Sequence, residues 1–118
     1  DIPDPEKLGP WCSADDLAYY VQQFAKSGFR GPLSYYRNHN EAWEMTADRP
    51  KQIHQPAMFA AGAKDGVIVM AAEALKAMPN HVTDLRINEL IPDIGHWTQQ
   101  EAPEKVNELI LQFLQEIA

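Results

Sequence analysis

The chain has 118 residues, of which 45% are hydrophobic and 23% charged, a composition typical of a folded globular domain rather than a disordered segment. The formal net charge of −7 argues against a nucleic-acid partner, because no basic patch could neutralise phosphates. No stretch approaches the roughly 20 apolar residues of a membrane helix, so we expect no membrane partner. The single cysteine, Cys12, excludes an internal disulfide and a cysteine-based zinc site, and it fits a reducing, cytoplasmic location.

The first part of the chain predicts helices after an extended start. The first twelve residues hold three prolines and indicate a loop. Ser13 is typical of a helix N-cap, and Gly28 of a helix end. Between them, apolar residues at helical spacing predict one apolar face: Leu17, Tyr20, Val21 and Phe24. A second, aromatic-rich helical stretch is expected from about Leu33 to Thr46, after the break at Gly31-Pro32.

The second part predicts a strand, a helix and a second strand. The apolar run Ala57–Gly62 is too short for a helix and indicates a strand buried on both faces, followed by a turn over 63–66. A helix is expected from about Met70 to Ala77. Apolar and polar residues then alternate with a period of two over 84–88, which indicates another strand. This order favours a parallel pair joined by a crossover helix.

The last element is a strongly amphipathic helix. Thr98 and Glu101 form a capping-box pattern, and Pro103 is expected just inside the helix start. The apolar stripe comprises Val106, Leu109, Ile110, Phe113, Leu114 and Ile117. Because two parallel strands and two helices cannot bury a sheet by themselves, the chain is expected to be part of a larger fold.

Two side chains could act together as a base and its support. Asp65 follows the first predicted strand and His96 follows the second, and the ends of adjacent parallel strands meet at one edge of a sheet, where ligands bind. A carboxylate can orient an imidazole and stabilise its protonated form. Taken singly, Asp65 fits an ordinary Lys-Asp-Gly turn and His96 fits a surface or core histidine. Their arrangement raises the hypothesis of a catalytic pair, in the acid-then-histidine order of α/β-hydrolases.

Other features leave the chemistry incomplete. The chain contains no G-x-S-x-G motif, and Asp65 is already assigned as the partner of His96, so we expect the nucleophile to lie outside this sequence. The aromatic segment around Tyr35 and Tyr36 permits two interpretations. Either the rings pack on a neighbouring layer with their hydroxyls at the rim, or one hydroxyl donates a hydrogen bond to a substrate oxygen.

Several motifs nevertheless resemble one family in order along nearly the whole chain. The run Tyr20–Phe24, the segment Ser27–Leu33 and the motif Tyr35-Tyr36-Arg37-Asn38 resemble the cap domain of soluble epoxide hydrolases. The segments 56–65 and 95–99, the latter followed by Glu101 and Pro103, resemble the last two strands of the same family's core.

The resemblance implies an α/β fold, the C-terminal part of an α/β-hydrolase with its last two parallel strands, preceded by part of a helical cap. Residues 1–50 would belong to the cap and residues 51–118 to the core. Tyr36 would be one of two cap tyrosines that bind and polarise the epoxide oxygen, Asp65 the carboxylate behind the base, and His96 the base. Trp97 is expected to contribute to substrate binding. No metal or organic cofactor is implied.

The implied reaction converts an epoxide to a vicinal diol through an aspartyl ester. The nucleophilic aspartate and second cap tyrosine would lie in a complementary N-terminal half, in the same or a separate chain, so we expect the isolated chain to be inactive. Two alternatives stay open. One is a haloalkane or haloacid dehalogenase of the same fold, which Tyr36 disfavours, and the other is a non-catalytic fragment that needs a complementary chain.

Overall fold

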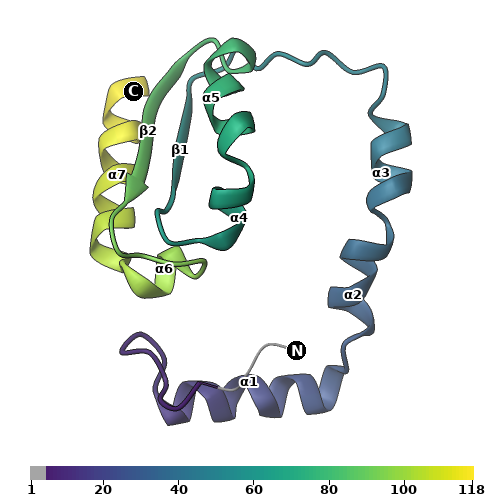
Figure 1. Ribbon diagram of the computed structural model, residues 1–118, viewed down its shortest axis with the longest axis vertical. Helices are drawn as coiled ribbons and strands as arrows, with labels where there is room; N and C mark the ends of the chain where they lie inside the picture. Colours follow the sequence, from purple (N-terminus) through teal and green to yellow (C-terminus); the bar gives the residue numbers. More distant parts are fainter. Residues whose placement is uncertain (1–4) are drawn as a thin grey trace. The chain divides into compact units, whose positions relative to one another are not determined.

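The computed structural model of the protein describes residues 5–118, which divide into two compact units between Arg49 and Pro50 (Figure 1). Residues 5–12 form turns and coil, in agreement with the predicted loop, whose first four residues lie outside the described part. The division lies next to the boundary expected between residues 1–50 and 51–118. Assignment of the two parts to a cap and a core remains a prediction.

The first unit contains three helices, α1 (Ala14–Ser27), α2 (Arg30–Arg37) and α3 (His39–Met45). The predicted N-cap at Ser13 is confirmed. The structure adds that it forms a capping box, in which the Asp16 N–H donates to Ser13 Oγ and the Ser13 N–H donates to the Asp16 carboxylate. Its end is confirmed at Gly28, whose φ of 65° is a conformation that glycine adopts without strain. The ring of Phe24 then stacks on that of Phe29, with centroids 4.7 Å apart, and this contact ties α1 to the start of α2.

The expectation of one helix from Leu33 to Thr46 is wrong in two respects. Helix α2 begins earlier, at Arg30, because Pro32 falls in its first turn, where backbone N–H groups have no helical partner in any case. The helical stretch is also divided at Asn38, a residue type that favours helix ends over helix interiors. Tyr36 therefore lies in the last turn of α2.

In the second unit, β1 (Ala57–Gly62) and β2 (Leu85–Ile91) form the predicted parallel pair, with Gly62 opposite Ile91 at their carboxyl ends. The period of two in β2 is confirmed, because Ile87 and Ile91 are buried and the residues beside them are not. Helix α7 (Pro103–Ile117) lies on one side of the strands, and α4 (Gly66–Met70) and α5 (Ala72–His81) lie on the other (Figure 1).

The crossover connection differs from the expected helix over Met70–Ala77. It begins four residues earlier, because the Asp65 side chain caps α4 by accepting a hydrogen bond from the Val67 N–H at 2.8 Å. After a break at Ala71, α5 continues to His81 with Pro79 inside it.

The predicted capping box at Thr98 and Glu101 is wrong. Thr98 is the first residue of a separate short helix, α6 (Thr98–Glu101), and its hydroxyl donates to the Gly95 carbonyl. The Glu101 carboxylate accepts from the backbone N–H groups of Gly95 and Trp97 instead. The helix start at Pro103 is confirmed, since α7 begins at that residue after a break at Ala102.

The core of the second unit is small and lies between the sheet and α7. Ile87, Ile91 and Leu109 form its buried centre, and partly buried apolar side chains surround them: Met58, Ala60, Ile94, Ala102, Val106 and Phe113. The sequence predicted that β1 is buried on both faces, and this prediction is wrong for residues 57–60, which are only half-buried. Among the described residues, β1 also has a neighbouring strand on one edge only.

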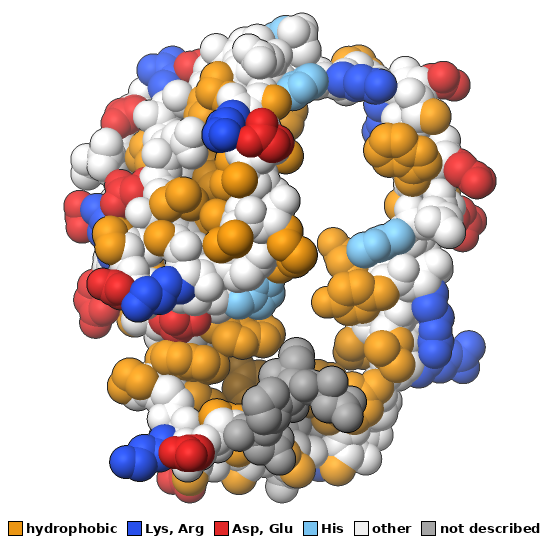
Figure 2. All heavy atoms as spheres, in the orientation of Figure 1, with side chains coloured by type: hydrophobic (Ala, Val, Ile, Leu, Met, Phe, Trp, Pro, Cys, Tyr) orange, Lys and Arg blue, Asp and Glu red, His pale blue; other side chains and the backbone are white. Residues whose placement is uncertain are grey.

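Large apolar side chains remain exposed on both units, as Figure 2 shows for one face of each. Examples are Tyr35, Trp43 and Met45 in the first unit, and Val69, Met70 and Leu111 in the second. Within residues 5–118, no helix combines the length and the apolar character that crossing a membrane requires.

Candidate active site

Asp65 lies three residues beyond the end of β1 and is held in one orientation by two hydrogen bonds. One carboxylate oxygen, Oδ1, accepts from the Val67 N–H at the start of α4, and the other, Oδ2, lies 2.9 Å from Nδ1 of His96. The residue is buried, with a relative exposure of 8%. Its pKa is held below the usual aspartate value, chiefly by the His96 hydrogen bond and then by the Val67 hydrogen bond.

His96 lies in the loop after β2, and its side chain is largely exposed. Because an ionised carboxylate can only accept hydrogen bonds, the contact with Asp65 requires Nδ1 of His96 to carry a proton and donate it. Nε2 of the neutral ring is then free to accept a proton. The His96 side chain is 61% exposed whereas that of Asp65 is 11% exposed, so the carboxylate stands behind an accessible imidazole. This arrangement can serve as a general base.

The end of β1 also positions the His96 loop. The backbone N–H groups of Ala63 and Lys64 donate to the carbonyls of Ile91 and Ile94, at 2.9 and 2.8 Å. Gly62 makes this close approach possible, since a Cβ atom at this position would overlap the carbonyl oxygens of Ile94 and Gly95. The loop after β2 is therefore fastened directly to the turn that carries Asp65.

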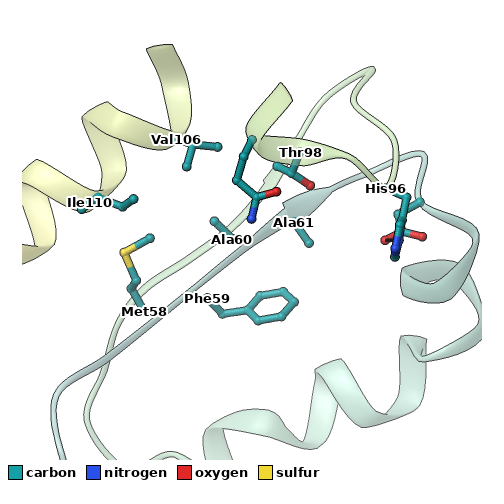
Figure 3. Close-up of a pocket in the computed structure, with 10 residues that line it drawn as sticks. Met58, Phe59, Ala60, Ala61, His96, Thr98, Val106 and Ile110 are labelled. Carbon is teal, nitrogen blue, oxygen red and sulfur yellow. Dashed lines mark hydrogen bonds and ion pairs between the residues drawn. The ribbon is translucent and has the colours of Figure 1, made fainter. Parts of the chain in front are cut away.

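A hollow of about 440 Å³ adjoins the pair (Figure 3). His96 lies at one end of it, and Ile110 of α7 lies toward the other. The remaining lining combines apolar and polar side chains from β1, the turn after it, α6 and α7: Met58, Phe59, Ala60, Ala61, Asp65, Thr98, Gln99 and Val106. Polar chemistry within this hollow is thus concentrated at the carboxyl end of β1.

The other two predicted site residues are Tyr36, in the first unit, and Trp97, in the second. Tyr36 lies on α2 in the first unit with 67% of its surface exposed, and its ring meets that of Tyr35 edge-on. Trp97 is adjacent to His96, with ring centroids 5.4 Å apart in an edge-on arrangement, and it is 53% exposed. Glu101 was predicted as a helix cap and not as a site residue. In the sequence, a glutamate that binds the His96 loop looks the same as a glutamate that caps a helix. The contact of Glu101 with this loop could therefore not be predicted from the sequence.

Solved structures of similar fold define the class of protein. An epoxide hydrolase from an endophytic Streptomyces matches 94% of the chain with a TM-score of 0.89 and 37% identity, and the chain covers 34% of it. Potato (Solanum tuberosum) epoxide hydrolase I matches 98% of the chain with a TM-score of 0.87 and 31% identity, and 38% of it is covered. The chain therefore has the fold of the C-terminal portion of an α/β-hydrolase, as predicted.

Curated relatives identify the family. Epoxide hydrolase B of Mycobacterium tuberculosis is 40% identical over 111 residues, which are 93% of this chain and 31% of that protein. Bifunctional epoxide hydrolase 2 of Rattus norvegicus is 38% identical over 113 residues, 95% of this chain and 20% of that protein. No family model matches the chain. The chain belongs to the epoxide hydrolase family and spans about a third or less of the length of these relatives.

Proposed function

We propose that the chain supplies the base, its supporting carboxylate and one substrate-binding tyrosine of an epoxide hydrolase that converts an epoxide to a vicinal diol. The observation that carries the proposal is the hydrogen bond between His96 and Asp65 at the carboxyl ends of two neighbouring parallel strands. The names of the relatives support the reaction class.

The proposed reaction has two steps. A nucleophilic aspartate outside these 118 residues attacks an epoxide carbon, the carbon–oxygen bond breaks, and an ester forms. The Tyr36 hydroxyl donates a hydrogen bond to the departing oxygen as negative charge develops on it. Nε2 of His96 then takes a proton from water, and the resulting hydroxide attacks the ester carbonyl. The bond between the carbonyl carbon and the alkoxide oxygen breaks, the proton on His96 passes to that oxygen, and the second proton of the water reaches the ring-opened oxygen, so that the diol leaves and the aspartate is regenerated.

Asp65 and Trp97 assist these steps. Asp65 keeps the His96 proton on Nδ1 and stabilises the imidazolium that forms when Nε2 accepts a second proton. The exposed Trp97 ring beside His96 offers an apolar surface to the carbon skeleton of the substrate. No step requires a metal or an organic cofactor.

The isolated chain is proposed to be inactive. The nucleophilic aspartate is proposed to lie outside these 118 residues. Among the described residues, β1 has no partner strand on its outer edge, and this edge and the exposed apolar side chains form a surface that the rest of the core would cover. In the relatives, the remaining two-thirds or more of the length belongs to the same polypeptide, which favours upstream sequence over a separate partner chain. The cytoplasmic location stays a prediction.

A dehalogenase is the second candidate, since it uses the same aspartate, histidine and acid. It requires donors for a halide, and Tyr36 in its Tyr-Arg-Asn motif favours an oxygen instead. The test is to give the complete polypeptide a panel of epoxides and haloalkanes and to measure diol and halide. Diol formation that His96→Gln abolishes is expected. Halide release without diol, or full turnover by the folded variant, would contradict the proposal.

A further inference from the structure

We propose that Glu101 is a positioning residue that holds the backbone on both sides of His96 and so keeps its imidazole aligned with Asp65. The inference rests on the proposed function, in which His96 activates water. It assigns to Glu101 a part in ester hydrolysis that is distinct from capping a helix.

The geometry consists of one side chain and two peptide groups. Glu101 Oε2 accepts from the Gly95 N–H at 2.7 Å, and Oε1 accepts from the Trp97 N–H at 3.0 Å. These are the N–H groups of the residues immediately before and after His96. Hydrogen bonds to a carboxylate are about twice as strong as those between neutral groups. Glu101 therefore restrains the 96–97 peptide unit, which directly follows the His96 Cα, and the 94–95 peptide unit, which lies one residue before the unit that precedes it.

The surrounding backbone makes this restraint stiff. The N–H groups of Gln100 and Glu101 both donate to the Trp97 carbonyl, at 2.9 and 2.8 Å, so α6 is itself joined to the loop it restrains. Gly95 lets the carboxylate approach, because a Cβ atom there would lie 3.0 and 3.2 Å from Oε1 and Oε2. Glu101 and Gly95 thus act as a matched pair.

Glutamine is the informative replacement at Glu101, because its amide has the same shape and only one acceptor oxygen. Its NH₂ group must face either the Gly95 or the Trp97 N–H, donor against donor, so one side of the His96 loop is released. Glu104→Gln is the matched control. Glu104 is an exposed residue in the first turn of α7, three positions further along.

The experiment measures steady-state kinetics and the covalent ester in the complete polypeptide. In a two-step reaction, kcat/KM reports ester formation, whereas kcat falls when ester hydrolysis becomes limiting. For Glu101→Gln we expect kcat to fall about ten- to a hundredfold, as for a small misplacement of a catalytic group, with KM falling in parallel and kcat/KM unchanged. Mass spectrometry should show the ester accumulating, and Glu104→Gln should behave as wild type.

A second variant separates positioning from loss of charge. Gly95→Ala keeps the Glu101 carboxylate but requires its oxygens to shift, because the new Cβ atom would lie 3.0 and 3.2 Å from them, and it should give the same kinetic pattern as Glu101→Gln with a smaller fall in kcat. Equal falls in kcat and kcat/KM at constant KM, the pattern of less folded enzyme, would overturn the proposal. So would unchanged kcat in both variants.

A spectroscopic measurement distinguishes failure of this inference from failure of the proposed function. The His96 Nδ1–H that donates to Asp65 should give a downfield proton resonance in the wild type and the Glu104→Gln variant, and a weakened or missing one in Glu101→Gln. If the wild type turns over no epoxide, the proposed function fails and this resonance alone decides the role of Glu101. An unaltered resonance in the variant would refute that role.

Discussion

Nδ1 of His96 lies 2.9 Å from Oδ2 of Asp65, although the two residues are 31 positions apart in the chain. The strand register produces this contact. Gly62 and Ile91 lie opposite each other at the ends of β1 and β2, so the segments that leave the two strands begin at the same level. Asp65 is reached three residues after Gly62, and His96 five residues after Ile91.

Replacing Asp65 with asparagine should reverse the tautomer of His96. The asparagine oxygen can still cap α4 by accepting from the Val67 N–H, but its NH₂ group then faces Nδ1, which must lose its proton to accept. With the proton moved to Nε2, the ring cannot take a proton from water. We expect kcat to fall by about 10³- to 10⁴-fold, with the covalent ester accumulating.

Asp93→Asn is the control for this prediction, because Asp93 lies in the same loop with an exposed side chain. Its pairing with Lys64 is a surface ion pair of the kind that contributes little. Wild-type kinetics are expected for Asp93→Asn. A kcat for Asp65→Asn within twofold of wild type would show that the carboxylate does not control the tautomer.

Acid should destabilise the folded protein partly through Asp65. Its folded-state pKa is lowered from the unfolded value of about 3.9, so in this range the unfolded state binds more protons than the folded state. The contribution of Asp65 to stability is therefore present above pH 4 and is lost as the pH falls through the folded-state pKa. Urea unfolding from pH 7 to pH 2 should show a shallower loss in Asp65→Asn than in wild type. Identical pH profiles would contradict this linkage.

Adding a methyl group at Gly62 should displace the His96 loop. The Cβ atom of Gly62→Ala would overlap the carbonyl oxygens of Ile94 and Gly95, whereas that of Gly66→Ala meets no atom within 4 Å. We expect Gly62→Ala to lower the free energy of unfolding by roughly 1–3 kcal/mol and to lower kcat. Gly66→Ala, the control, should be neutral or slightly stabilising. Denaturant unfolding of both variants checks this. Equal free energies of unfolding for the two variants would mean that the loop shifts to accept the new Cβ atom without a loss of stability.

Removing the Tyr36 hydroxyl should slow ring opening rather than ester hydrolysis. Tyr36→Phe keeps the ring and deletes the donor proposed to stabilise charge on the epoxide oxygen, so kcat/KM should fall about a hundredfold. Tyr35→Phe is the control, since it removes the hydroxyl of the adjacent exposed residue on the same helix. If Tyr35→Phe shows the loss and Tyr36→Phe does not, the proposed assignment of the donor is wrong.

Much of the second unit could be predicted from the sequence because its signals are local. The limits of β1 follow from the apolar run between Pro56 and the 63–66 turn, and the face of β2 follows from a period of two. The parallel order follows from the helix between the strands. The contact between Asp65 and His96 then follows from topology, because neighbouring parallel strands end at one edge.

The limits of the short helices could not be predicted in the same way. The sequence predicted a break at Gly31-Pro32, but Pro32 lies in the first turn of α2. A proline is tolerated there because the N–H that it lacks would have no partner within the helix. The sequence predicted that Asp65 is part of a turn, but its side chain also caps α4. The first helix of the crossover therefore begins at Gly66, earlier than predicted. In each case, the residue type is compatible with two local structures, and the sequence does not indicate which of the two forms.

By itself, the sequence determined the strands, their parallel order, the edge where Asp65 and His96 meet, and the family resemblance, since all of these depend on periodicity and motif order. Only the tertiary structure decided what Glu101 binds and why Gly62 must lack a side chain. A flexible carboxylate has several backbone donors within reach, and a glycine is required only where another segment approaches. Both features depend on contacts between residues that are distant along the chain or lie across a loop. Local sequence patterns do not encode such contacts.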